Sequence, residues 1–295
     1  MLEIRPLSAD DLDDALTLST QAGWNQLPAD WERLFACCPA GCFAGTVDGE
    51  LVATTTVITY GADGDGADVS WIGMVLVDEA HRGQGFGSRI FEHGLEYARE
   101  NGGGLVGLDA THLGEPIYRN YGFERVEPVF RWQGTLPRPE DLADEQEPRH
   151  DKETIERLTS PDVDAILEFD CRHVGVDRST LLEELFAEPE VRGFYSRTST
   201  GIEGYAVIRP GRTHWQIGPL VAAKPSVVGP LLRAVSADLA GEAVIVDSPE
   251  RGPTTTSLEA LGLSRERELV RMTYPNREPA LVAESVHGFL DFAFG

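Results

Sequence analysis

A glycine-rich hexapeptide, Arg82-Gly83-Gln84-Gly85-Phe86-Gly87, carries the clearest chemistry in this chain. An apolar, β-branched run at residues 72–77 precedes it, and apolar residues at helical spacing follow it to about residue 100. Glycine lets a backbone come close to a bound phosphate, and the first turn of a helix presents unpaired N–H groups at the positive end of its dipole. The stretch therefore predicts a strand, a tight turn and a helix that together bind a phosphate or pyrophosphate.

The residue types in this turn discriminate between kinds of phosphate site. A Walker loop needs Gly-Lys-Ser/Thr, and residues 82–88 contain no lysine. A dinucleotide fingerprint has the order G-x-G-x-x-G with an acidic residue on the next strand, whereas the order here is R-x-x-G-x-G. A second motif, Tyr118-Arg119-Asn120-Tyr121-Gly122-Phe123, stands about thirty residues further along the chain.

Together the two motifs resemble the GNAT acyltransferase superfamily, through its acetyl-CoA signature and its Y-x-x-x-G-F helix end. The resemblance implies the fold class α/β (α+β), with two GNAT-like domains. Each would hold a mixed, mostly antiparallel sheet flanked by helices, with a splayed parallel strand pair in the first. The predicted element order, β-α-α-β-β-β-α-β-α-β, fits this layout over residues 1–134, where a strand at 123–133 completes the sheet of the acetyltransferase domain.

The second half is expected to be a degenerate copy of the first. Residues 135–152, acidic and proline-containing, predict a linker, and residues 153–295 repeat the plan with strands at 193–221, a helix at 226–239 and a strand at 265–273. Where the glycine turn would stand, residues 222–228 contain a proline and β-branched residues, which cannot offer the same amide cradle. This half resembles a tandem GNAT subfamily and is expected not to bind CoA, while the role of the tail at residues 282–294 is open.

The resemblance implies acetyl-CoA as cofactor and assigns its main-chain contacts to the central strand and the turn. Gly73, inside an otherwise apolar strand, predicts a bulge or a close backbone approach, or else relief of crowding beneath Trp71. Met74 and Val75 are the candidates for the N–H that meets the thioester carbonyl. The full set of expected cofactor contacts is Met74, Val75, Leu76, Val77, Arg82, Gly83, Gln84, Gly85, Phe86, Gly87 and Ser88. The Arg82 side chain either supplies charge or shapes the loop.

Acetyl transfer to an amine needs proton movement at both reacting groups. Tyr118 matches the tyrosine that relatives use to protonate the departing thiolate, and the alternative is a core tyrosine at the helix end. Relatives often carry a glutamate on the central strand as base, but Ser70-Trp71-Ile72-Gly73 offers none. Asp109, at the end of the neighbouring strand, is the best-placed carboxylate; it could serve as base, cap a loop or bind substrate.

Trp24 and Asn25 lie where the superfamily folds a helix–helix loop over the acceptor. An aromatic ring and an amide suit a polar or cationic small molecule, although Trp24 could simply pack the loop down. Asp177, Arg178 and Arg271, all in the second half, either help to close a pocket between the domains or form structural ion pairs. The reaction expected is acetyl transfer to a primary amine of a small molecule. The alternatives are a protein lysine or N-terminal acetyltransferase and a non-catalytic acyl-CoA sensor.

The composition of the chain limits the kinds of partner and the cellular location that can be expected. The formal charge is −24, from 49 acidic and 25 basic residues, which predicts either adaptation to high internal salt or an acidic cytosolic protein. A nucleic-acid surface is not expected because no basic patch is present. No apolar run approaches the ~20 residues of a membrane span, and no signal-like region opens the chain, so a cytoplasmic location is expected. The four cysteines lack metal-site spacing, so no metal is expected; the protein is taken to be a monomer or homodimer.

Overall fold

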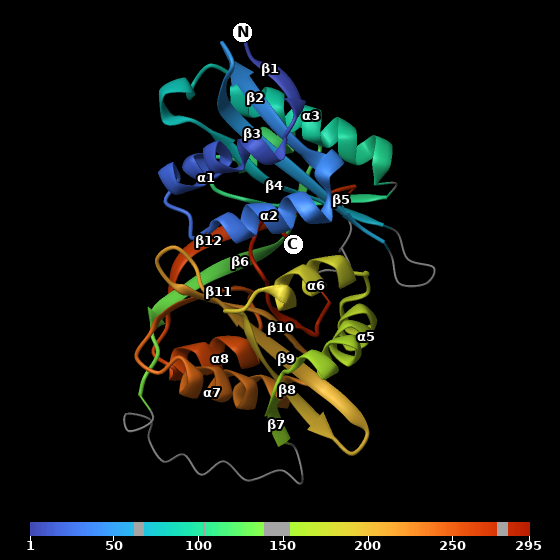
Figure 1. Cartoon of the computed structure of the whole chain (residues 1–295), viewed down its shortest axis with the longest axis vertical. Coiled ribbons are helices and arrows are strands. Elements are labelled where there is room, and N and C mark those ends of the chain that lie inside the picture. Colours follow the sequence, from blue (N-terminus) through green and yellow to red (C-terminus); the bar gives the residue numbers. More distant parts are fainter. Residues whose placement is uncertain (62–67, 103, 139–153, 276–282) are drawn as a thin grey trace. The chain divides into compact units, whose positions relative to one another are not determined.

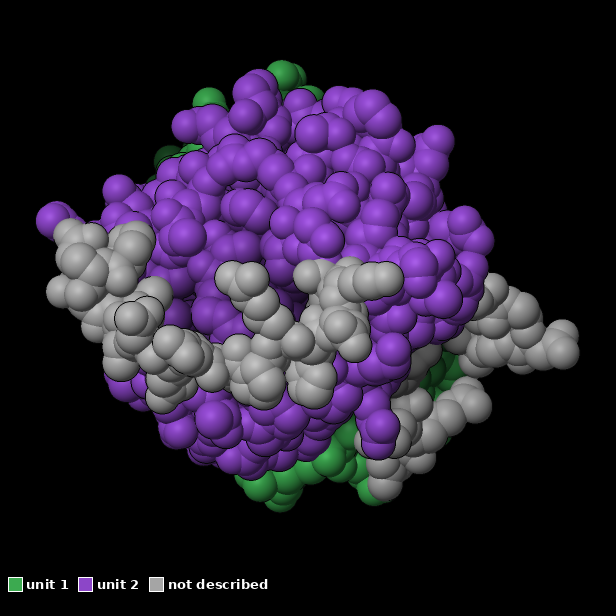
Figure 2. Space-filling model, turned by 90° about the horizontal axis from the view of Figure 1, so that it is seen from below, with its two compact units in different colours: residues 1–126, 270–279, 292–295 green, residues 127–269, 280–291 purple. Residues whose placement is uncertain are grey.

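A computed structural model describes residues 1–61, 68–102, 104–138, 154–275 and 283–295 (Figure 1). The chain divides into two compact units, shown in different colours in Figure 2. Unit 1 comprises residues 1–126, 270–279 and 292–295, and unit 2 comprises residues 127–269 and 280–291. Each unit therefore includes a segment that is distant in the sequence from the rest of it.

Unit 1 is a six-stranded mixed sheet with helices on both faces. In chain order its elements are β1 (Glu3–Pro6), α1 (Leu12–Gln21), α2 (Pro28–Cys37), β2 (Cys42–Val47), β3 (Glu50–Tyr60), β4 (Val69–Val77), α3 (Phe86–Asn101), β5 (Leu105–Ala110), α4 (Glu115–Asn120) and the end of β12 (Ser264–Tyr274). The strands pair in the order β1-β2-β3-β4-β5-β12, and only β4 and β5 run parallel. This confirms the expected mixed, mostly antiparallel sheet.

The elements of unit 2 repeat the order of unit 1, with one more strand before the repeat and one after it. They are β6 (Glu124–Thr135, from residue 127), β7 (Thr154–Arg157), α5 (Val163–Val174), α6 (Ser179–Ala187), β8 (Arg192–Thr198), β9 (Gly201–Arg209), β10 (Trp215–Ala222), α7 (Val228–Asp238), β11 (Ala243–Pro249), α8 (Gly252–Ala260), β12 up to residue 269, and β13 (Val286–Gly288). The strands pair as β7-β8-β9-β10-β11-β6, with β10 and β11 parallel. Strand β13 adds to β10 in antiparallel orientation.

The two halves of the chain exchange their last strands. Residues 129–135 of β6 pair with β11, while residues 270–274 of β12 pair with β5. The strand expected to complete the first sheet therefore belongs to the second, and the compact units depart from the expected domains 1–134 and 153–295. Side chains fix the β6–β11 pairing: Arg131 donates to both Asp247 oxygens at 2.7 and 2.6 Å, and the Trp132 indole donates to Ser248 at 3.1 Å. Most of the expected linker lies outside the described residues.

Unit 1 buries apolar side chains on the α3 face of its sheet. Val57 and Ile72 on β3 and β4 pack with Phe91 and Leu95 on α3, because alternate strand residues point to the same face. Helix α3 is amphipathic, as its spacing predicts. None of the helices in the described residues is long and apolar enough to span a bilayer.

Candidate functional site

The glycine turn joins β4 to α3 in a conformation that requires glycine. Gly83 and Gly85 have φ values of +77° and +79°, and nothing lies within 4 Å of where a Cβ would stand on either. Helix α3 begins immediately after Gly85 and runs for 16 residues. Its first-turn N–H groups, from Phe86 to Ser88, have no intrahelical acceptor, so they point outward at the positive end of the dipole. The turn can therefore bind an anion through main-chain groups.

The Arg82 side chain contacts the turn itself. Its Nε donates to the Val77 carbonyl oxygen at 3.2 Å, and its Nη1 lies 3.4 Å from a Glu79 carboxylate oxygen. Both charged side chains are more than half exposed. The guanidinium thus ties the start of the turn to the last residue of β4, which is the geometry expected if Arg82 shapes the loop.

Strand β4 separates from β5 beside this turn. The two strands pair only at Val69, Ser70 and Trp71, and among the described residues no strand pairs with that side of β4 beyond Trp71. A bulge follows: the register with β3 shifts after Gly73, and Met74 has a φ of +49°. The Thr54 hydroxyl donates to the Met74 carbonyl oxygen at 2.8 Å and holds the bulge. The edge from Met74 to Val77, assigned above to the cofactor, is thus open to a ligand on one side.

Gly73 is a point of close backbone approach, which is one of the alternatives that its position in the strand predicts. A Cβ placed on Gly73 would lie 2.8 Å from the Ala293 carbonyl oxygen and 3.0 Å from the Ala293 Cα. Only glycine leaves room for both chains at that distance. The partner, a segment more than two hundred residues away, was not foreseen from the sequence.

Tyr118 lies on α4 with its ring against the α3 core. The ring centroid is 4.6 Å from that of Phe91 and 6.4 Å from that of Phe123. Burial raises the pKa of Tyr118 to about 12. Within the described chain its hydroxyl makes no hydrogen bond, so it holds a proton at neutral pH without a protein acceptor. Tyr121 packs edge-on to Phe91, with the two ring centroids 5.2 Å apart.

Asp109 on β5 forms a bidentate ion pair with Arg271 on β12. Nε and Nη2 of Arg271 each donate to one Asp109 oxygen at 2.8 Å, and both side chains are at most 1% exposed. The two residues are direct cross-strand partners in the sheet of unit 1. The guanidinium also lies 4.5 Å from the Trp71 ring centroid. Arg271 is therefore a structural ion-pair partner, one of the two roles left open by the sequence.

Trp24 and Asn25 lie in the short connection between α1 and α2, as expected. Gly23, with a φ of +74°, turns the chain, and the Trp24 N–H donates to the Ser19 carbonyl oxygen at 3.0 Å. Asn25 is 5% exposed, whereas Trp24 keeps part of its surface accessible. Trp24 is thus the member of the pair that can reach a ligand without movement of the loop.

Unit 2 contains the same bulge but fills the space beside it. The β10–β11 pairing ends at Ile217, and the register of β10 shifts at Gly218, as in β4. Here β13 pairs with Leu220 and Val221, and the Phe289 N–H donates to the Asp247 carbonyl oxygen at 2.7 Å. Unit 2 thus has its own strand where the edge of β4 is open in unit 1.

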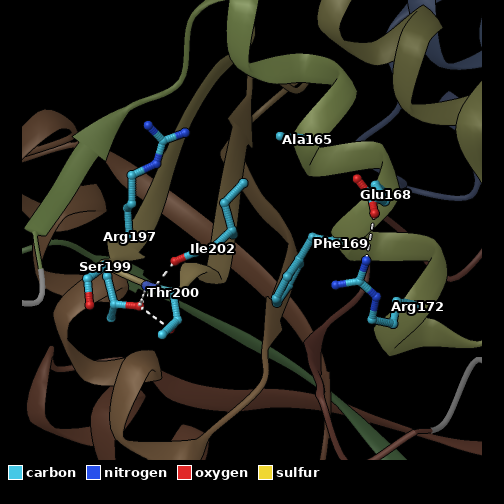
Figure 3. A pocket seen from close by; sticks show the side chains of 10 residues that line it. Ala165, Glu168, Phe169, Arg172, Arg197, Ser199, Thr200 and Ile202 are labelled. Carbon is cyan, nitrogen blue, oxygen red and sulfur yellow. Dashed lines mark hydrogen bonds and ion pairs between the residues drawn. The ribbon is translucent and has the colours of Figure 1, made fainter.

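A separate cavity of about 470 Å³ opens in unit 2 between α5 and the β8–β9 hairpin (Figure 3). Phe169 forms its apolar wall, and Arg172 and Arg197 approach it from the helix and the hairpin. Glu168 neutralises Arg172 at 2.7 Å. None of the site residues predicted from the sequence lines this cavity.

Comparison with known proteins agrees with the two motifs. Residues 9–123 match the model of the Acetyltransferase (GNAT) family, and residues 166–288 match the model of an Acetyltransferase (GNAT) domain. Holothin acyltransferase of Pseudoalteromonas sp. (strain SANK 73390) is 26% identical over 227 residues, which cover 77% of this chain and 71% of that protein. Streptothricin acetyltransferase of Streptomyces lavendulae is 31% identical over 90 residues, which cover 26% of this chain and 48% of that protein.

Solved structures share the fold of the whole chain. A putative acetyltransferase from Pyrococcus horikoshii has a TM-score of 0.80 at 21% identity, covering 99% of this chain and 95% of that one. A tandem GNAT protein from the clavulanic acid biosynthesis pathway, solved without AcCoA, has a TM-score of 0.62 at 16% identity, covering 94% and 100% of the two chains. With a GNAT match in each half and the matching order of elements in both units, this chain belongs to the GNAT acetyltransferases, as a tandem member of the superfamily.

Proposed function

We propose that this protein transfers an acetyl group from acetyl-CoA to a primary amine of a small molecule. The observation that carries the proposal is the placement of the glycine turn beside the open edge of β4. Gly83 and Gly85 hold the turn in a conformation that exposes the first N–H groups of α3, and the β4–β5 pairing stops at Trp71. A pyrophosphate and an extended arm can therefore bind side by side, through main-chain groups alone.

Acetyl-CoA would supply an activated thioester, and the chain would hold it. Residues 82–88 would bind the pyrophosphate. Residues 74–77 would bind the pantetheine arm through main-chain hydrogen bonds, like those between neighbouring strands of a sheet. In the described part of unit 2, residues 223–228 after β10 contain no glycine, and β13 already pairs with Leu220 and Val221. These features support one cofactor site per chain and a degenerate second domain.

Tyr118 and Asp109 would have different roles in the site, one in proton transfer and the other in holding two strands together. Tyr118 would act as general acid. Its pKa is raised to about 12, so the hydroxyl is protonated at neutral pH, and it donates to no acceptor in the described chain. Both Asp109 oxygens accept from Arg271, which leaves them poorly placed to take a proton from an amine. Asp109 would therefore act as a positioning residue that joins β5 to β12. The proton of the amine would leave through water.

The acceptor would bind near the α1–α2 connection, against Trp24 and Asn25. An indole face and a side-chain amide suit a cationic or polar amine. The two curated relatives take their names from individual compounds, holothin and streptothricin, rather than from a protein substrate. We further expect the protein to act in the cytoplasm, as a monomer or homodimer.

Calorimetric titration with acetyl-CoA in molar KCl tests the cofactor site. One site per chain is expected, and Gly85→Glu should abolish binding because a side chain would be strained at that φ and would add negative charge. Gly49→Glu is the matched control, since Gly49 has a φ of +88° and open space around it but lies in the β2–β3 hairpin. Two sites per chain would contradict the proposal that the second domain binds no CoA. A folded protein that binds no acetyl-CoA would contradict the proposed function. Binding without CoA release on a panel of amines would instead support an acyl-CoA sensor.

A further inference from the structure

The segment Phe292–Gly295 belongs to unit 1 and lies on the face of β4 opposite α3. The Trp71 indole donates to the Phe292 carbonyl oxygen at 2.9 Å, and the Tyr60 hydroxyl donates to the Phe294 carbonyl oxygen at 2.8 Å. The Phe294 ring is 1% exposed and lies 5.8 Å from the Arg33 guanidinium of α2. The segment is therefore buried and bound through its main chain.

The segment lies directly over the bulge of β4. Ala293 approaches Gly73 so closely that a Cβ on Gly73 would collide with the Ala293 carbonyl oxygen at 2.8 Å. Ile72, the neighbour of Gly73, points to the other face and packs with Phe91 of α3. At the bulge, one face of the strand is thus covered by α3 and the other by Phe292–Gly295.

The residues just before this segment are held in unit 2. Val286 and Gly288 pair with β10, and a Cβ on Gly218 would lie 1.8 Å from the Phe289 carbonyl oxygen. Within unit 1 the segment is held by the two hydrogen bonds from Trp71 and Tyr60 to its main chain and by the burial of Phe294.

We propose that Phe292–Gly295 is the acceptor-side wall of the acyl-transfer site and restricts the acceptor to small amines. The inference rests on the proposed function, because it takes the β4 bulge as the position of the acetyl group. A lysine within a peptide reaches a buried strand only if the flanking peptide backbone lies over the same face. That space is held by the main chain of residues 292–294. A small amine has no flanking backbone and would not need that space.

A stability cycle tests the contact without any turnover. Gly73→Ala in the full chain is expected to lower the Tm by several degrees, because the added methyl displaces Ala293. The same substitution in a chain truncated after Asp291 is expected to have a much smaller effect, since the colliding atoms are gone. Gly61→Ala, at a position with nothing within 4 Å, is the matched control and should leave the Tm unchanged in both chains. Equal effects of Gly73→Ala in both chains would overturn the inference.

A comparison of acceptors tests whether Phe292–Gly295 excludes peptides from the site. CoA release is measured for the full chain and the chain truncated after Asp291, with a panel of small primary amines and with a blocked hexapeptide that contains one lysine. The full chain should use a small amine and not the peptide, and truncation should raise kcat/KM for the peptide at least about tenfold relative to the small amine. Equal use of the peptide by both chains overturns the inference. An equal increase in kcat/KM for the peptide and the small amine on truncation also overturns the inference, because the segment would then obstruct both acceptors alike. No release from either chain with any acceptor would instead mean that the proposed function fails.

Discussion

Asp109 and Arg271, which are 162 positions apart in the sequence, are cross-strand neighbours in unit 1 and form a bidentate ion pair with both distances at 2.8 Å. The pair joins β5, which belongs to the first half of the chain, to β12, which the second half contributes. Its side chains are almost fully buried, so neither charge is solvated by water. The sheet of unit 1 therefore depends on a charge from each half of the chain.

Asp109→Asn is expected to lower the free energy of unfolding by about 3 kcal/mol, because it leaves the Arg271 guanidinium buried without its counter-charge. Arg271→Met should cost a similar amount, and the double variant should cost less than the sum of the two. Urea denaturation monitored by tryptophan fluorescence measures all three. A variant Asp109→Asn with wild-type stability and a large loss of kcat would show that Asp109 acts as a base instead.

Tyr118→Phe is expected to lower kcat for acetyl transfer by about 10-fold to 100-fold and to leave the KM for acetyl-CoA unchanged. The ring keeps its packing against Phe91, and only the proton donor is lost. Because the pKa of Tyr118 is raised to about 12, the ratio of wild-type to variant kcat should stay constant from pH 7 to pH 10. Tyr121→Phe, on the same helix end, is the control and should leave kcat unchanged. An equal kcat for Tyr118→Phe and wild type would rule out the acid role.

Arg82→Lys and Arg82→Ala are expected to weaken acetyl-CoA binding to the same extent. Lysine keeps the charge but has no Nε–H to donate to the Val77 carbonyl oxygen, so it cannot hold the turn. Calorimetric Kd values for the two variants, at low and at molar KCl, provide the comparison. A Kd restored by lysine at low salt, and lost again at high salt, would show that Arg82 acts through its charge.

Acid is expected to destabilise unit 2 through His287 on β13. Burial and the nearby Arg251 cation lower the pKa of His287 to about 4, and its Nδ1 lies 2.8 Å from the Thr254 hydroxyl. The unfolded chain, with a histidine pKa near 6.5, binds the proton more readily. Stability from the neutral ring is therefore complete above about pH 6.5 and is lost as the pH falls toward 4.

His287→Gln removes this titration. Between pH 7 and pH 5 the wild-type free energy of unfolding should fall by about 2 kcal/mol more than that of the variant. Urea denaturation at fixed ionic strength across this range measures the difference, and the carboxylates shared by both proteins cancel. Parallel pH profiles for the two proteins would show that His287 does not titrate with a lowered pKa.

The elements next to the glycine turn could be predicted from the sequence because local features specify them. A continuous apolar, β-branched run defines β4, helical spacing defines α3, and glycine suits the positive φ values at positions 83 and 85. Asp48-Gly49 likewise specifies the β2–β3 hairpin. Helix α8 was not foreseen, because Gly252–Ala260 has few apolar residues and no amphipathic stripe.

The strand partners were decided by the tertiary structure alone. The apolar residues of β6 predict a strand, and residues 129–132 at its centre are buried, but this pattern carries no information about which strand it pairs with. The pairing is fixed by distant side chains, Asp247 opposite Arg131 and Asp109 opposite Arg271. For this reason the expected boundary at residue 134 and the observed units differ.

Gly73 shows most clearly how far the structure could be predicted from the sequence. A glycine inside an apolar strand predicted a bulge, the close approach of another backbone, or relief of crowding beneath Trp71. It could not indicate that this backbone is Ala293, because the contact joins segments more than two hundred residues apart and no local preference brings them together. The sequence by itself determined the chemistry of the turn and the need for space at Gly73. Only the folded chain, through long-range packing and buried ion pairs, decided what occupies that space and which strands complete each sheet.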